Sequence, residues 1–442
     1  MSKRYFGTDG IRGVAGEPPL DAATVYAIGL ALGDDLQGGT VVLGEDTRES
    51  SPAIAAQLAA GLSARGVEVA HAGVLPTPGV AFLAATGKFR AGVMISASHN
   101  PWQDNGIKIF GASGYKLPDE EEAAIEAAIE KYRPLPAAAP ERLRTSPELR
   151  AAYATSLAER FRDTNFRGLR FVIDCGNGAA SSVVGELCAR LNIRAEIIAA
   201  TPDGRNINAG VGALHPQAMT EQVRQSGADA GVALDGDADR AILADAQGGQ
   251  IDGDCVLWMM AHELHLPHVV GTVMTNLGLE LALRRDGIAL ERTQVGDKYV
   301  LERMQQRGVA LGGEPSGHVI FANEATTGDG LRTALHCFAL MARKRQPLRA
   351  LCAGWQALPQ KIVNVRVDRK QPLEELRGTQ AAIHTAEREF NGAGRVLVRY
   401  SGTEMLARVM VEAADGGLVE RHAQAIALAL QHDLRDRNAV SG

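Results

Sequence analysis

Short apolar runs followed by one-sided helical patterns recur three times in the first three-quarters of the chain. The apolar runs lie at residues 40–44, 170–173 and 269–273, and the helical patterns lie at residues 51–66, 181–187 and 277–285. In the first copy, Ser51 is the expected N-cap and Pro52 takes the first helical position. Each copy therefore predicts a strand, a turn and a helix.

Further breaks and patterns divide the chain into four domains. The proline-rich segment 134–140 suits a stiff connector, residues 241–245 read as a hairpin-like return, and a second break lies near residues 249–253. Beyond residue 359 the apolar positions alternate, then a helix and the apolar run 396–398 follow. We predict an α/β protein with three similar mixed-sheet α/β domains and a smaller α+β domain at the C-terminal end. The predicted bounds are 1–148, 149–252, 253–361 and 362–442.

Composition agrees with a multidomain enzyme that acts on small molecules. At 442 residues the chain is too long for one hydrophobic core. Its 46 basic and 52 acidic residues give a formal net charge of −6, which argues against a nucleic-acid or anionic-membrane partner. The five cysteines contain no Cys-x-x-Cys pair, so neither a disulfide framework nor a thiolate metal site is indicated. Without a signal-like or membrane-spanning segment, a cytoplasmic location is expected.

A turn with two hydroxyls follows the apolar run 93–95. Residues 95–101 read Ile-Ser-Ala-Ser-His-Asn-Pro. A serine at the carboxyl end of a strand lies where open α/β sheets bind ligands, so Ser96 and Ser98 are both candidate nucleophiles. The residue pattern alone does not choose between them.

Three aspartates alternate directly after the apolar run 231–234. In an extended loop, Asp235, Asp237 and Asp239 fall on the same side and can converge on one cation. Oxygen ligands without histidine favour Mg²⁺ over zinc. The alternative is a solvated acidic turn, but three carboxylates this close would repel one another without a cation. We therefore predict a metal site.

Two later loops offer groups for hydroxyls and for a phosphate. Glu314 and Ser316, within Gly-Glu-Pro-Ser-Gly-His at residues 313–318, provide acceptors and a donor suited to hydroxyls. The second loop combines cations and hydroxyls around a glycine whose neighbouring N–H groups can cradle a phosphate. Its members are Arg399, Ser401, Gly402, Thr403 and Arg408.

These motifs, with Phe-Gly-Thr-Asp-Gly-Ile-Arg-Gly at residues 6–13, resemble the α-D-phosphohexomutase family in content and order. The resemblance implies four domains around a central cleft and identifies Ser98, not Ser96, as the phosphorylated serine. It also implies one Mg²⁺ per subunit, held by the three aspartates together with the phosphoserine. Tyr400 and Met405 depart from the family, which usually has proline at both positions.

The resemblance also implies a role for each remaining candidate. His99, Lys108 and Arg12 match positions around the reacting centre, and Arg240 matches a cation close to the transferring phosphoryl group. Glu314, Ser316 and His318 would bind the sugar. The loop with Arg399, Ser401, Gly402, Thr403 and Arg408 would bind the phosphate that is not reacting.

The resemblance implies a phosphosugar mutase activity. Residues 202–208 and 295–300 are similar to the members that interconvert D-glucosamine 6-phosphate and D-glucosamine 1-phosphate, for amino-sugar nucleotide and cell-wall synthesis. The reaction would pass through a 1,6-bisphosphate, with glucose or glucosamine 1,6-bisphosphate as activator, in a monomer or homodimer. Residues 211–213, Val-Gly-Ala, depart from those members. The alternatives are a mutase for mannose or glucose phosphates and a non-catalytic phosphosugar sensor.

Overall fold

The computed structural model describes residues 5–401 and 405–436. Contacts divide the chain into two compact units. The first extends to Thr272 and includes Glu291–Ala353, and the second comprises Val273–Leu290 and the chain from Gly354 onward. No helix of the described residues is both long enough and apolar enough to cross a bilayer.

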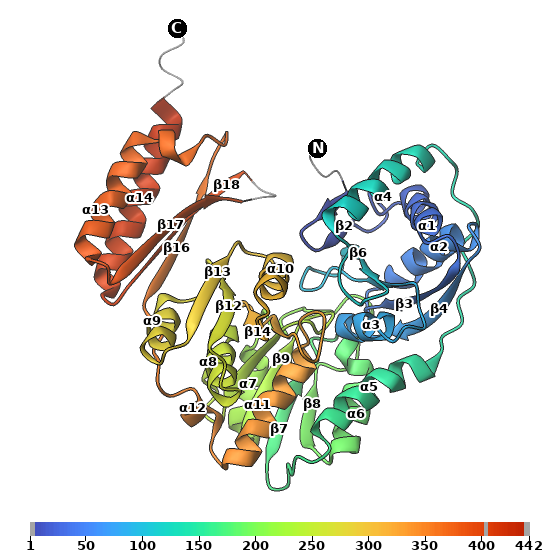
Figure 1. The fold of residues 1–442 in the computed structure, drawn as a ribbon, viewed down its shortest axis with the longest axis horizontal. Coiled ribbons are helices and arrows are strands. Elements are labelled where there is room, and N and C mark those ends of the chain that lie inside the picture. Colours follow the sequence, from blue (N-terminus) through green and yellow to red (C-terminus); the bar gives the residue numbers. More distant parts are fainter. Residues whose placement is uncertain (1–4, 402–404, 437–442) are drawn as a thin grey trace. The chain divides into compact units, whose positions relative to one another are not determined.

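The first sheet has six strands, and helices cover it (Figure 1). Its order is β1-β2-β6-β5-β3-β4. The strands are β1 (Phe6–Gly7), β2 (Gly10–Val14), β3 (Gly39–Glu45), β4 (Val67–Val74), β5 (Ala91–Ile95) and β6 (Asp104–Gly111), and the helices are α1 (Ala22–Leu36), α2 (Ser51–Ser63), α3 (Thr77–Ala84) and α4 (Asp119–Tyr132). β3 runs parallel to β4 and β5, whereas β6 is antiparallel to β5. Apolar side chains of α1, α2 and α4 pack on the sheet in one buried core.

The predicted start of α2 is wrong by one residue. Ser50 is the N-cap, and Ser51 is the first helical residue. The buried hydroxyl of Ser51 does not cap the helix but donates a 2.8 Å hydrogen bond to Asp46. A tertiary partner therefore takes the side chain that local sequence assigned to the cap.

The second sheet has five strands in the order β11-β10-β9-β7-β8. Its elements are α5 (Pro147–Phe161), β7 (Arg170–Asp174), α6 (Val184–Leu191), β8 (Arg194–Ile198), α7 (Gln217–Ser226), β9 (Ala230–Leu234), β10 (Ala241–Asp245) and β11 (Gln250–Ile251). β7 is parallel to β8 and β9, and β9 and β10 form the predicted antiparallel hairpin. The helix predicted from residue 181 begins later, because a 3₁₀ turn, Ala179–Ser182, precedes α6.

The third sheet has four strands in the order β13-β12-β14-β15. Its elements are α8 (Gly253–Glu263), β12 (His268–Thr272), α9 (Leu277–Arg285), β13 (Ala289–Thr293), α10 (Asp297–Arg307), β14 (Leu311–Gly313), β15 (Val319–Phe321), α11 (Gly330–Lys344) and α12 (Leu348–Leu351). By its contacts, α9 belongs to the second unit. β14 is parallel to β12 and antiparallel to β15.

All three sheets contain the same four-strand core. Numbered by their place in the chain, its strands lie in the order 2-1-3-4, and the last pair is antiparallel. The predicted fold class is thereby confirmed for the three mixed sheets. In each sheet, the loop between the third and fourth strands carries one of the polar motifs. Those loops hold Ser98, the three aspartates and Glu314.

The last sheet is antiparallel, and two helices cover it. Its order is β16-β18-β17. The elements are β16 (Gln360–Arg366), α13 (Arg377–Phe390), β17 (Gly394–Tyr400), β18 (Leu406–Ala413) and α14 (Gly416–Asp436). As the alternation predicted, Val365 faces the core with the helices, whereas Ile362 is 40% exposed. The smaller α+β domain is confirmed, while the four domain bounds stay a prediction.

Candidate active site

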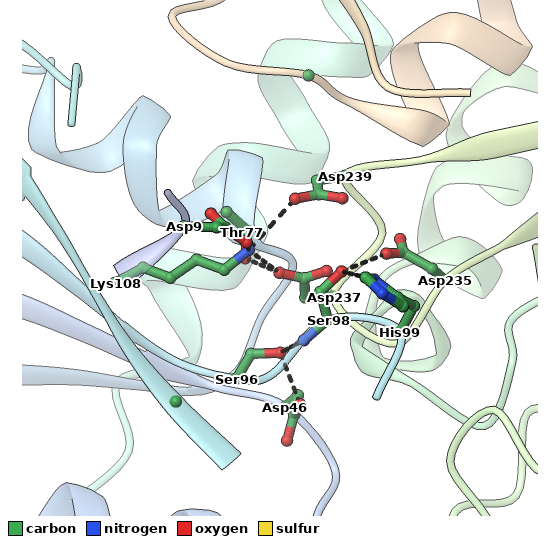
Figure 2. A network of polar contacts seen from close by, with 12 residues as sticks. Asp9, Asp46, Thr77, Ser96, Ser98, His99, Lys108, Asp235, Asp237 and Asp239 are labelled. Atoms are coloured by element: carbon green, nitrogen blue, oxygen red, sulfur yellow. Dashed lines mark hydrogen bonds and ion pairs between the residues drawn. The ribbon is translucent and has the colours of Figure 1, made fainter. Parts of the chain in front are cut away.

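Ser98 lies on the turn between β5 and β6 and points at an aspartate of the second sheet (Figure 2). Its hydroxyl is fully buried and donates a 2.7 Å hydrogen bond to Oδ2 of Asp235. The backbone of Ser98 has a φ of +54°, a conformation that L-residues rarely adopt. Ser96 has another task, because its hydroxyl accepts from the Ser98 N–H at 2.9 Å and donates to Asp46 at 2.7 Å. The geometry thus separates two serines that the residue pattern could not.

The turn between β9 and β10 lies directly against the Ser98 turn. A Cβ on Gly236 would come within 2.5 Å of the carbonyl oxygen of Ser98, so only glycine permits this approach. The Thr77 N–H donates to the carbonyl of Asp237 at 3.0 Å, and its hydroxyl donates to the Asp237 carboxylate at 2.6 Å. Backbone and side-chain bonds therefore fix the acidic turn against the first sheet.

The three aspartates fit a divalent cation. One carboxylate oxygen from each of Asp235, Asp237 and Asp239 lies within 4.8 Å of the others, and all three residues are buried. Oδ1 of Asp237 and Oδ1 of Asp239 are buried without a hydrogen-bond partner among the described residues. Burial, and then the charges of Asp239 and Asp237, raise the pKa of Asp235 well above its ordinary value. A hard cation would remove that penalty and use the unpartnered oxygens.

Lys108 of β6 links the acidic turn to the N-terminal hairpin. Its ammonium lies 2.7 Å from Asp237, 3.3 Å from Asp239 and 3.0 Å from Asp9. Burial alone would lower the pKa of Lys108, but the Asp237, Asp9 and Asp239 carboxylates outweigh it and hold the pKa well above its ordinary value. Asp9 also pairs with Lys116 at 2.5 Å, and Lys116 pairs with Asp297. The buried charges therefore form a continuous, paired network.

Two arginines form the cationic side of the site, and His99 lies beside one of them. Nη1 of Arg240 lies 3.0 Å from Nδ1 of His99, and since a guanidinium can only donate, the histidine nitrogen accepts. Burial, and then the charges of Arg240 and Arg12, lower the pKa of His99 to about 4, so the imidazole is neutral at pH 7. Nε of Arg12 is buried without a partner among the described residues, and Arg12 pairs with Asp9.

The turn between β14 and β15 presents the third set of candidates. Glu314 is held in place, because its carboxylate accepts from the Gly296 N–H at 3.0 Å. The hydroxyl of Ser316 is buried and has no hydrogen-bond partner within the described chain, which leaves it available to a ligand. Nδ1 of His318 lies 3.6 Å from Asp239, and its Nε2 accepts from the Gly328 N–H at 3.1 Å. His318 therefore bridges the third sheet to the acidic turn.

The remaining predicted residues lie in the second unit. Arg399 of β17 and Arg408 of β18 are direct cross-strand partners, and both line a cavity of about 210 Å³ with Met274 and Asn364. Burial, and then the charge of Arg408, lower the pKa of Arg399. Like charges directly opposite on a sheet are unfavourable unless an anion lies between them. Ser401 is buried, whereas Gly402 and Thr403 lie outside the described residues.

Sequence reasoning missed the residue that anchors the serine turn. Arg48 is fully buried, and its guanidinium pairs with Asp46 at 2.8 Å. The same guanidinium donates to the carbonyls of Ser98 and Asn100 at 2.9 Å, and to those of Pro101 and Asp104. The charged residues that directly follow the apolar run 40–44 could have indicated Arg48 as a site residue. Sequence reasoning also missed Asp9 and Thr77. The partners Lys108 and Lys116 of Asp9, and Asp237 of Thr77, are remote in sequence.

Family models match nearly the whole chain in four consecutive segments. They describe the phosphoglucomutase/phosphomannomutase alpha/beta/alpha domains I, II and III and C-terminal domain, which match residues 3–135, 151–249, 252–358 and 362–429.

Relatives of similar length are identical to this chain at nearly half of the aligned positions. The phosphoglucosamine mutase of Koribacter versatilis is 48% identical over 97% of this chain and 97% of its own length. That of Symbiobacterium thermophilum is also 48% identical, over 98% of this chain and 100% of its own.

Solved structures share the fold. A phosphoglucomutase/phosphomannomutase family protein from Burkholderia thailandensis has a TM-score of 0.78 at 25% identity and covers 96% of this chain and 97% of its own. The N-acetylphosphoglucosamine mutase of Aspergillus fumigatus, solved with GlcNAc-6P and magnesium, has a TM-score of 0.67 at 19% identity, covering 98% and 96%. At that identity the second likeness shows the fold alone.

Proposed function

Because the chain belongs to the phosphoglucomutase/phosphomannomutase family, the α-D-phosphohexomutases, we propose that it is a phosphoglucosamine mutase. It interconverts D-glucosamine 6-phosphate and D-glucosamine 1-phosphate. The observation that carries the proposal is the Ser98 hydroxyl, buried 2.7 Å from Asp235 in a group of three carboxylates. A pure phosphosugar sensor has no use for a buried serine held against a cation site.

Ser98 carries the phosphoryl group in the resting enzyme. In the forward reaction the bond from Ser98 Oγ to phosphorus breaks, and O1 of glucosamine 6-phosphate forms the new bond, which gives the 1,6-bisphosphate. The O1 hydroxyl loses its proton, and Ser98 Oγ gains one and becomes a free hydroxyl. After the bisphosphate turns over, Ser98 Oγ takes the phosphoryl group from O6. Glucosamine 1-phosphate leaves, and the enzyme is phosphorylated again.

Asp235, Asp237 and Asp239 would hold one Mg²⁺ per subunit, together with a phosphoryl oxygen on Ser98. The metal, when bound, withdraws negative charge from the phosphoryl group and so lowers the barrier to transfer. Arg240 and Arg12 add positive charge on the same side. Lys108, whose ammonium stays charged, offsets the carboxylates of Asp237 and Asp239. Neutral His99 accepts from Arg240 and thereby orients its guanidinium.

Two loops would hold the two ends of the substrate. The fixed Glu314 carboxylate and the unpartnered Ser316 hydroxyl suit sugar hydroxyls and the amino group, and His318 lies beside them. Arg399 and Arg408, with Ser401, Gly402 and Thr403, would bind the phosphate that is not reacting. The bisphosphate reverses its orientation between the two half-reactions. This loop must therefore bind the 6-phosphate in the first half-reaction and the 1-phosphate in the second.

Glucose or glucosamine 1,6-bisphosphate would activate the enzyme by phosphorylating Ser98. We place the protein in the cytoplasm, because its substrate is a small phosphosugar, and we expect a monomer or homodimer.

A coupled assay of glucosamine 1-phosphate formation tests the function. With bisphosphate present, kcat/KM for glucosamine 6-phosphate should exceed that for glucose 6-phosphate or mannose 6-phosphate by about tenfold or more. A higher kcat/KM for glucose 6-phosphate or mannose 6-phosphate would establish a mutase for glucose or mannose phosphates instead. Absence of turnover with all three, from protein phosphorylated on Ser98, would leave only the sensor.

A further inference from the structure

A cavity lined by arginines lies where β7 and β8 of the second sheet begin, away from the serine turn. Its volume is about 660 Å³, and its lining contains five arginines and no carboxylate. The arginines are Arg162, Arg167, Arg170, Arg190 and Arg194. For a chain with a net charge of −6, this is a strong local concentration of positive charge.

Strand register brings two of these arginines together. Arg170 begins β7, Arg194 begins β8, and the two are direct partners across the parallel pair. Neighbouring like charges on a sheet are unfavourable unless an anion lies between them. The same relationship joins Arg399 and Arg408 in the second unit, where the pair also lines a cavity. Among the described residues, both of these cross-strand arginine pairs line a cavity.

The cavity combines anchored and free guanidinium groups. Arg170 donates to the carbonyl of Gly227 at 2.5 Å, and Arg190 pairs with Glu186 at 2.7 Å, so both are held in place. Arg162 lies 3.6 Å from the exposed Asp163. Arg167 and Arg194 have no side-chain hydrogen bond or ion pair within the described part of the chain. The two free guanidinium groups have ten donor hydrogens between them that only water or a ligand can satisfy.

A second cavity adjoins the first. Its volume is about 710 Å³, and it shares Arg167 and the neighbouring residues Asn165, Gly168 and Leu169 with the first. It adds Arg345 and also Arg343, whose guanidinium pairs with Glu263 at 2.9 Å. The one carboxylate in its lining, Asp229, accepts the backbone N–H of Arg170 at 2.8 Å.

We propose that this arginine cavity is a second anion site, separate from the catalytic site, which binds a small molecule carrying a diphosphate group. One phosphate would engage about two guanidinium groups in bidentate fashion, so five arginines suit at least two linked phosphates. The volume is in the range of about 300–1,000 Å³ that is usual for small-molecule sites. Phe166, the aromatic residue of the lining, is only 2% exposed and cannot stack on a base. The diphosphate, rather than a base or sugar attached to it, is therefore recognised.

The proposed site and the catalytic turn lie at opposite ends of the same strands. β9 lies beside β7 and ends one residue before Asp235. The arginine cavity is therefore at the end of the sheet where these parallel strands begin, and the catalytic turn is at the end where they finish. Five residues of strand separate them by about 16 Å. That distance is too great for one ligand to fill both sites, and the proposal does not depend on the mutase activity.

Calorimetric titration of the full-length protein in EDTA at low salt tests the site, with sodium pyrophosphate as the probe. The test variant is R167A/R194A, and the matched control is R142A/R144A, which removes two exposed arginines elsewhere. Pyrophosphate should bind the wild type and the control alike, and about tenfold or more weaker to R167A/R194A. Uridine diphosphate should bind within about threefold of pyrophosphate, and inorganic phosphate about tenfold weaker. Both double variants should keep the wild-type circular dichroism spectrum, which shows that they fold.

Equal pyrophosphate affinity of R167A/R194A and the wild type would overturn the proposal, as would no binding to the wild type. Phosphate binding as tight as pyrophosphate would overturn the diphosphate assignment. If a duplex oligonucleotide bound the wild type more tightly than pyrophosphate and lost that affinity in R167A/R194A, the occupant would be nucleic acid, and the small-molecule proposal would be wrong. A variant that fails to fold can be replaced by R194A alone, with R144A as its control.

Discussion

The hydroxyl of Ser98 donates to Oδ2 of Asp235 over 2.7 Å, across the boundary between the first and second sheets (Figure 2). Ser96, two residues earlier, instead supports the backbone of that turn. The purified enzyme should therefore carry phosphate on Ser98, and S98A should lose both the phosphate and the activity. S96A should keep phosphate on Ser98 but lose some turnover. Peptide mass spectrometry with site localisation checks this, and phosphate on Ser96 with an active S98A would contradict the assignment.

Replacing Asp237 by Asn should lower kcat far more than it raises KM. The change removes a charge from the cation site and from the ion pair with Lys108, so the transition state loses more than the ground state. A loss of about a hundredfold or more in kcat is expected. Steady-state kinetics measure it, and excess EDTA should have a similar effect on the wild type. Undiminished activity in EDTA would exclude the metal role.

Replacing Arg48 by Met should destabilise the serine turn. The buried guanidinium binds Asp46 and four carbonyls of the turn and its neighbours, so its loss leaves a carboxylate and several acceptors unpaired. We expect the free energy of unfolding to fall by about 3–5 kcal/mol. Urea denaturation measures it, and phosphate on Ser98 should decrease in parallel. The control is R205M, which removes the exposed pair with Glu49 and should leave the free energy of unfolding nearly unchanged.

The sequence predicts elements and loops well where a pattern is local. The strands before Ser98 and Asp235 are apolar, so the polar turns that follow them stand out. Arg48 was missed because its acceptors lie 50 to 56 residues further along the chain. Ser51 was assigned to the wrong role because Asp46 competes with the helix backbone for its hydroxyl. Local propensity describes the alternatives open to a side chain, and tertiary partners decide among them.

His336 should make stability fall as the solution is acidified below neutrality. Burial lowers the pKa of His336, and its Nε2 lies 3.0 Å from Glu324 while its ring stacks on Phe321. The folded protein therefore holds fewer protons than the unfolded chain at pH values below the ordinary histidine pKa of about 6.5. Stability that is fully present above that value is lost as the pH falls towards the lowered pKa.

The variant H336Q isolates that contribution. It should be less stable than the wild type at pH 7.5, because the ring contacts are lost, but the difference in Tm should shrink towards pH 5.5. Calorimetric melting at several pH values measures it. H215Q, which changes an exposed histidine, is the control and should follow the wild type throughout. A constant Tm difference between H336Q and the wild type would show that His336 does not contribute to the pH dependence.

Replacing Arg399 by Ala should weaken the reaction equally in both directions. The cross-strand pair of Arg399 and Arg408 lines one cavity, and the proposed cycle brings the 6-phosphate and the 1-phosphate there in turn. Loss of a charge-assisted hydrogen bond costs about 1.5–3 kcal/mol, so kcat/KM should fall about ten- to a hundredfold from either substrate. Phosphate on Ser98 should persist, because that residue lies in the other unit. Kinetics from glucosamine 6-phosphate and from glucosamine 1-phosphate measure the two losses. If only one direction suffers, the loop binds one phosphate rather than both, and the bisphosphate does not turn about a shared anchor.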